Sequence, residues 1–146
     1  MFKKIYVLYL IVFIAITIFG FIIANYGINN QDKHVYVLPN GYTGWVKIVY
    51  DQKDSPPLIR EGSDYVNLIP ANGILRTSNP STSGVMEIYY LDEQGNRNKL
   101  ASDMIQSRSA KVVEVQRSDG TFEDQSVYLF FIGTKEQWKE EMLRNP

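Results

Sequence analysis

A run of twenty apolar residues near the N-terminus constrains this chain more than any other feature. The run extends from Ile5 to Ala24, and its only polar side chains are two tyrosines and one threonine. A helix rises about 1.5 Å per residue, so this length reaches roughly 30 Å, the thickness of a bilayer hydrocarbon core. We therefore predict a transmembrane helix over residues 5–25, preceded by a cytoplasmic N-terminus of residues 1–4.

The flanks of this run predict its orientation. Lys3 and Lys4 precede it and the next basic residue is Lys33, so the positive-inside rule places the C-terminal part outside the cell. A secreted protein released by signal cleavage is the alternative. A cleaved signal has a shorter apolar core of about 7–15 residues followed by small residues, whereas Tyr26 stands where the second small residue belongs. We favour an uncleaved signal anchor that crosses the cell membrane once.

The rest of the chain predicts a short linker and one domain. Residues 26–32 are rich in Gly, Asn and Gln, and residues 33–146 carry enough apolar side chains for one core. The chain has no cysteine, which excludes a disulfide scaffold, a thiolate metal site, a cysteine nucleophile and a lipid-anchor cysteine. With 15 basic and 16 acidic residues and no basic patch, we expect no nucleic-acid partner.

Short runs rich in β-branched and aromatic residues, separated by turn formers, indicate strands throughout this domain. We predict strands at 34–38, 44–50, 65–69, 74–77, 86–91, around 99–100, 112–116 and 126–132. Asn40-Gly41 suits a tight turn, so the first two strands are predicted to pair antiparallel, with Val46, Ile48 and Tyr50 facing the core. The fold class is therefore mainly β, an antiparallel β-sandwich, with a small β-barrel as the alternative.

The C-terminal region predicts an interior strand followed by a helix. The sequence SVYLFFI, Ser126 to Ile132, is apolar on both alternating faces and should be covered on both sides. Thr134 and Gln137 have the spacing of a capping box, and a short helix from about Lys135 to Leu143 should follow.

Several short motifs together resemble a known family. They are LPNGYTGWVKIVY, SPPL, VNLIPANGILRTS, IYYLDEQGNR and FFIGTKEQW, spread over nearly all of Lys33 to Leu143. This order resembles a bacterial family, known mainly from bacilli, of uncharacterised secreted or membrane-anchored proteins catalogued as a domain of unknown function. The resemblance implies a transthyretin-like, or prealbumin-like, sandwich and brings no activity or catalytic residues.

Catalytic and metal chemistry find little support in the sequence. The single histidine, His34, has no serine and acid in a triad pattern around it, and we expect a surface or strand-edge residue. The acidic turns at Asp51 and Asp54, at 92–96 and at 119–124 lack calcium-loop spacing and are interpreted as turns. We predict no catalytic residue, no metal ligand and no cofactor.

The remaining candidate surface is aromatic. Tyr42 and Trp45 lie close to the predicted turn, and exposed rings there could stack on a sugar or anchor a protein partner. Packing within the domain is the competing interpretation of both residues.

Three functions remain open at this stage. The first is a non-enzymatic, membrane-tethered envelope module that acts by protein or peptide contact. The second is a glycan or small-ligand binding module of the cell surface. The third is a hydrolase, which would need paired carboxylates such as Glu61 and Asp64.

Overall fold

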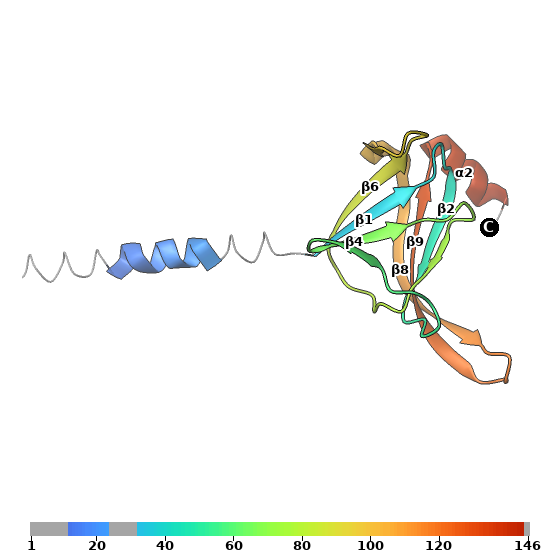
Figure 1. Ribbon diagram of the computed structural model, residues 1–146, viewed down its shortest axis with the longest axis horizontal. Coiled ribbons are helices and arrows are strands. Elements are labelled where there is room, and N and C mark those ends of the chain that lie inside the picture. Colours follow the sequence, from blue (N-terminus) through green and yellow to red (C-terminus); the bar gives the residue numbers. More distant parts are fainter. Residues whose placement is uncertain (1–11, 24–31, 145–146) are drawn as a thin grey trace, which may run out of the picture. The chain divides into compact units, whose positions relative to one another are not determined.

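The computed structural model describes residues 12–23 and 32–144, which belong to two compact units (Figure 1). The first unit ends at Gln31, and within it residues 12–23 are helical. No helix within residues 12–23 and 32–144 has both the length and the apolarity needed to cross a membrane. The ends of the predicted anchor, residues 5–11 and 24–25, and nearly all of the predicted linker lie outside the described residues.

The second unit, Asp32 to Pro146, is built on two β-sheets. The first sheet has five strands in the order β3-β4-β1-β6-β7. Their bounds are β1 Lys33–Leu38, β3 Ile59–Glu61, β4 Asp64–Leu68, β6 Val85–Leu91 and β7 Arg97–Lys99. The central strand β1 runs parallel to both of its neighbours, β4 and β6.

The second sheet has four strands in the order β5-β2-β9-β8. Their bounds are β2 Gly44–Val49, β5 Ile74–Arg76, β8 Ile105–Gln116 and β9 Phe122–Ile132. Strand β2 runs parallel to β5 and antiparallel to β9, and β8 and β9 form a long antiparallel hairpin. A 3-10 turn, η1 Ser102–Met104, leads into β8, and the helix α2 Lys135–Arg144 follows β9.

The two sheets share one hydrophobic core, as the predicted sandwich requires. Tyr36 of β1 and Phe130 of β9 meet edge to face across it, with ring centroids 5.3 Å apart. The predicted core face of β2 is confirmed, because Val46, Ile48 and Tyr50 are all buried in this cluster. The buried members of the core are Tyr36, Leu38, Val46, Ile48, Tyr50, Ile69, Ile88, Leu100, Phe130 and Ile132.

The predicted antiparallel hairpin of the first two strands is wrong. Asn40-Gly41 does form a turn, in which the Tyr42 amide donates to the Pro39 carbonyl at 3.1 Å, but β1 and β2 then enter different sheets. Both edges of β1 are occupied by β4 and β6, so β2 has no free edge to pair with there. The antiparallel class is corrected for the same reason: both sheets are mixed, with parallel pairs around β1 and beside β2.

Strand β9 occupies the interior position predicted for it, between β2 and β8. The hairpin is longer than its apolar pattern indicated, since β8 begins at Ile105 and β9 at Phe122. A bulge between Gln106 and Ser109, where Ser107 has a φ of 45°, interrupts the ladder. Beyond the bulge the far end of the hairpin projects from the rest of the domain (Figure 1). We call this projecting part, residues 111–126, the arm.

The predicted capping box at the start of α2 is confirmed. The Thr134 amide donates to Gln137 Oε1 at 2.8 Å, and the Gln137 amide donates back to Thr134 Oγ1 at 3.2 Å. These two bonds satisfy amides that the first helical turn leaves without a partner. The helix therefore begins at Lys135, as predicted, and ends one residue later than expected.

Candidate functional site

Tyr42 lies in the loop between β1 and β2 and is partly buried. Its hydroxyl donates to the Trp45 carbonyl oxygen at 2.6 Å, and its own carbonyl accepts from the Tyr90 hydroxyl at 2.9 Å. Gly73 lies directly beneath, where any side chain would collide with the Tyr42 hydroxyl. Burial raises the pKa of Tyr42, so its hydroxyl is neutral at physiological pH. These contacts fix the crossing from β1 to β2.

Trp45 lies on the face of β2 that points away from the core, as the alternation predicted, and is partly buried there. It packs edge to face on its cross-strand partner Phe131, with ring centroids 5.5 Å apart. The structure thus gives Tyr42 and Trp45 separate contacts within the domain. Binding of a partner by these two residues stays a prediction.

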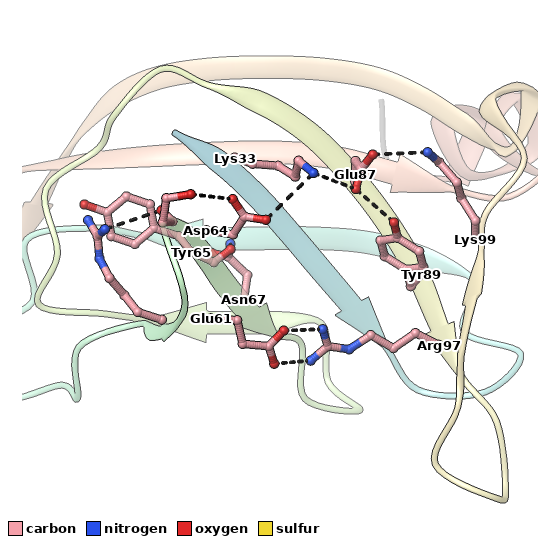
Figure 2. A network of polar contacts seen from close by, with 11 residues as sticks. Lys33, Glu61, Asp64, Tyr65, Asn67, Glu87, Tyr89, Arg97 and Lys99 are labelled. Atoms are coloured by element: carbon pink, nitrogen blue, oxygen red, sulfur yellow. Dashed lines mark hydrogen bonds and ion pairs between the residues drawn. The ribbon is translucent and has the colours of Figure 1, made fainter. Parts of the chain in front are cut away.

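The outer face of the five-stranded sheet carries a network of ion pairs (Figure 2). Lys33 lies between Asp64 and Glu87, with nitrogen–oxygen distances of 3.8 and 3.6 Å. Arg97 holds both carboxylate oxygens of Glu61, at 2.6 and 2.7 Å. Glu87 also accepts from Lys99 at 3.2 Å and from the Tyr89 hydroxyl at 2.8 Å. Three cations therefore neutralise three carboxylates on this face.

Beneath this network lies a second, smaller apolar cluster. Val35, Val37 and Val66 are buried there, with Tyr89 packed against them. Long charged side chains can cover apolar surface with their aliphatic stems while their charged ends pair above it. The network thus has a packing role, and its balanced charge offers nothing to attract an ionic ligand.

The carboxylates considered for a hydrolase belong to this face. Glu61 and Asp64 are cross-strand partners on β3 and β4. The Arg97 guanidinium lowers the pKa of Glu61, whereas a general acid needs a raised one. The geometry therefore gives the hydrolase hypothesis no support at Glu61.

The acidic turns form no recognisable metal site. Asp92 accepts from the amides of Gln94 and Asn96 at 3.0 and 2.7 Å, which lowers its pKa and closes the turn before β7. Between the loop 51–55 and the arm, including its turn, a polar hollow is lined by acidic and basic side chains together, among them Asp51, Arg117 and Asp124. Within the described parts of the chain, no group of three or more His, Asp or Glu residues is placed to hold a metal ion.

The expected surface position of His34 is wrong. His34 lies near the start of the central strand β1 and is only 4% exposed. Its ring stacks on Tyr65 at 5.2 Å between centroids, and its Nε2 lies 3.1 Å from Thr82 Oγ1. The alternation in HVYVL could have indicated that His34 is buried. Every second residue of a strand points to the same face, and His34 therefore shares a face with the core residues Tyr36 and Leu38.

Several apolar side chains of the arm are exposed to solvent. Phe122 and Val112 expose 62% and 64% of their surface, and Val115 exposes 38%. Strand β8 is also an edge strand, so its outer side has no strand partner among the described residues. Sequence reasoning missed this surface because the polar spacing of the hairpin resembled an ordinary solvated turn.

Comparison with known proteins identifies the family. The model of a family of unknown function, DUF6843, matches residues 30–142. The chain belongs to DUF6843. The match covers the whole two-sheet domain up to α2, so the expected membership in a family of unknown function is confirmed.

A solved structure supports the fold of this DUF6843 domain. A protein described as a putative lipoprotein from Bacillus anthracis has a similar structure, with a TM-score of 0.57 and 20% sequence identity. The similarity covers 71% of this chain and 72% of that one. No curated protein matches the chain. The transthyretin-like strand arrangement implied by the resemblance stays a prediction.

Proposed function

We propose that this DUF6843 protein is a non-enzymatic, membrane-tethered module of the cell envelope that binds an extended segment of another protein along the arm. The observation that carries the proposal is the free edge of β8. Its 12 residues form one of the two longest strands of the domain and lie at the border of the second sheet. An edge of this length offers unpaired backbone donors and acceptors to an incoming strand.

The side chains of the arm support the same contact. Natural edge strands are protected by charges, proline or covering loops. The outer half of β8 carries two charges, Lys111 and Glu114, but it also contains three valines and no proline. Val112 shares a face of the hairpin with Phe122, and both are largely exposed. A partner strand would gain main-chain hydrogen bonds from the edge and apolar contacts from these two residues.

The apolar N-terminal segment supports the tether. Within the helix over residues 12–23, nine large apolar side chains expose between 47% and 72% of their surface. So much exposed apolar surface is stable only in lipid or against another protein. The similar structure from Bacillus anthracis is described as a putative lipoprotein, which supports a location on the outer side of the cell membrane. Since this sequence has no cysteine to carry a lipid, we assign the tether to residues 5–25.

Photocrosslinking in intact cells tests the arm. A photoreactive phenylalanine analogue is placed at Phe122 and, as a matched control, at Val85, an exposed position on the first sheet. We expect a discrete protein adduct from the Phe122 position and none from Val85. Introducing Val112→Lys on the same chain, on the face that Val112 shares with Phe122, should abolish the adduct. Equal adducts from both positions, or none from either, would contradict the proposal.

Glycan or small-ligand binding is a second candidate. It is favoured by a cavity between the sheets around His34, which reaches β8 at Ala110, just before the arm begins. The two functions are separable, because the cavity and the arm use different residues.

A further inference from the structure

A cavity of about 330 Å³ lies between the two sheets at the end where β1 and β6 begin. The first sheet contributes His34, Tyr36 and Met86 to its wall, and the second sheet side contributes Tyr50, Ala110 and Tyr128. The loop 81–84 closes another side. This volume lies at the lower end of the range of small-molecule sites in proteins.

The lining has two chemically different walls. Tyr128 is partly exposed and forms the aromatic wall, whereas Tyr36 and Tyr50, which also line the cavity, are buried with 3% and 2% exposure. The exposed loop residues Ser81, Thr82 and Ser83 form a hydroxyl wall. The Ser81 and Ser83 side chains form no hydrogen bond within the described residues, and the Tyr128 hydroxyl reaches only the weak acceptor Sδ of Met86, at 3.4 Å. The cavity therefore holds hydroxyl groups that can still bind a ligand.

No charged side chain lines the cavity. Its lining residues include no Asp, Glu, Lys or Arg. Burial lowers the pKa of His34 against the opposing charge of Asp32, and burial raises the pKa of Tyr36 and of Tyr128. These side chains are therefore neutral at physiological pH. A charged ligand would lose its hydration here without gaining an opposite charge.

His34 makes this an organised site. Its imidazole stacks on the rings of Tyr65 and Tyr36, and its Nε2 forms a hydrogen bond with Thr82 of the hydroxyl wall. Its Nδ1 is buried and has no hydrogen-bond partner among the described residues. A buried polar atom without a partner is uncommon in a folded domain and costs stability unless something else compensates it.

We propose that this cavity binds one neutral sugar ring, a hexose or an N-acetylhexosamine unit of a larger glycan. A sugar ring has an apolar C–H face that packs on aromatic rings and several hydroxyl groups that need hydrogen-bond partners. The aromatic wall and the hydroxyl wall match these two requirements. An aromatic side chain from a peptide would fill the space without using the loop hydroxyls, which are exposed and would stay solvated. This inference develops the glycan candidate and does not depend on the arm.

The test uses the full chain in detergent micelles and ligand-detected saturation-transfer NMR. The probes are the methyl glycosides of glucose, galactose and N-acetylglucosamine, with glucuronic acid as a charged sugar and phenol as an aromatic side-chain mimic. We expect saturable binding of at least one neutral glycoside and weaker or no binding of glucuronic acid and phenol. If no neutral glycoside binds, or if phenol binds more tightly than all of them, the proposal is overturned.

Variants locate the binding. Tyr128→Phe keeps the ring and removes the cavity hydroxyl, and should weaken binding roughly threefold to tenfold, the usual effect of one lost hydrogen bond. Tyr89→Phe is the matched control, because it removes a hydroxyl on the outer face, and should leave binding unchanged. Ala110→Leu should fill the cavity and abolish binding while thermal melting confirms the fold. Glycoside binding that survives both Tyr128→Phe and Ala110→Leu would place the sugar elsewhere and overturn the assignment.

An arm variant separates this proposal from the protein-contact function. Phe122→Ser should lose the crosslinked protein partner and keep glycoside binding. Loss of glycoside binding in Phe122→Ser would contradict the cavity assignment, because Phe122 does not line the cavity.

Discussion

The two halves of strand β9 show how one strand can serve two purposes. In the inner half, Val127 to Ile132, four of six side chains are buried, and Phe130 is completely so. In the outer half, Phe122 to Ser126, no residue is buried and Phe122 is mostly exposed. Both halves pair with β8 in the same antiparallel ladder. Since the backbone pairing with β8 is the same in both halves, the difference in burial comes from the other elements that cover each half.

The cover comes from the other elements of the domain. The inner half of β9 has β2 on its second edge and the first sheet across its core face, where Tyr36 meets Phe130. Strand β2 ends at Val49, which pairs with Val127, and the Tyr50 amide still donates to the Ser126 carbonyl at 3.0 Å. Beyond that bond the outer half has β8 as its one strand neighbour among the described residues. An apolar residue in the inner half therefore stabilises the fold, and an apolar residue in the outer half is available to a partner.

The largest effect expected from this difference is at Phe130. Phe130→Ala should lower the free energy of unfolding by about 3–5 kcal/mol, because it leaves a cavity at the centre of a fully covered core. Urea denaturation followed by circular dichroism measures the loss. A loss below about 1 kcal/mol would mean that the inner half is not the stabilising part of the strand.

Trp45→Ala should have an intermediate effect. The indole is partly buried and loses one edge-to-face contact with Phe131, so we expect about 1–2 kcal/mol. The same urea denaturation, run beside the Phe130→Ala protein, gives the ranking. If Trp45→Ala is as destabilising as Phe130→Ala, the outer face of the second sheet is as well covered as its core face.

Acidification should cause a smaller loss that originates at His34. Burial holds the pKa of His34 below its ordinary value of 6.5, so the unfolded chain binds a proton more readily than the folded one. The stability contributed by neutral His34 is complete above about pH 6.5 and is lost as the pH falls below that value. Thermal melts from about pH 7.5 to 5.5 measure this slope, before the carboxylates titrate.

The His34→Gln protein is the control for this pH dependence. It cannot take up the proton, so its melting temperature should change less over the same range. An equal slope in both proteins would assign the pH dependence to another group.

The smallest effect on stability is expected in the arm. Phe122→Ser should change the free energy of unfolding by less than about 0.5 kcal/mol, because the ring is exposed at the far end of the hairpin. The same substitution should abolish capture of a protein partner. A clear loss of stability would show that the arm packs against the domain and would remove the contrast between the two halves of β9.

Local patterns in the sequence predicted most of the strands, the face of β2 that enters the core and the capping box of α2. The pairing of the strands was harder to predict from the sequence. The turn at Asn40-Gly41 was correctly located, yet it joins strands of different sheets because β4 and β6 flank β1. Strand β3 was missed because its three residues, Ile59, Arg60 and Glu61, show no apolar alternation. The Tyr42 and Trp45 surface was proposed from proximity in sequence, whereas the structure gives each ring its own contact.

The sequence by itself determined where most of the strands lie, which residues are apolar enough to be buried and that an apolar segment precedes the domain. These properties depend on composition and on a spacing of two to four residues, which the chain carries locally. The tertiary structure alone decided that the sheets are mixed, that a cavity lies beside His34 and that the outer half of β9 is uncovered. Each of these depends on contacts between residues far apart in the chain, such as His34 with Thr82 and Tyr36 with Phe130. Local spacing does not encode such contacts, because they follow from which strands occupy which sheet edges.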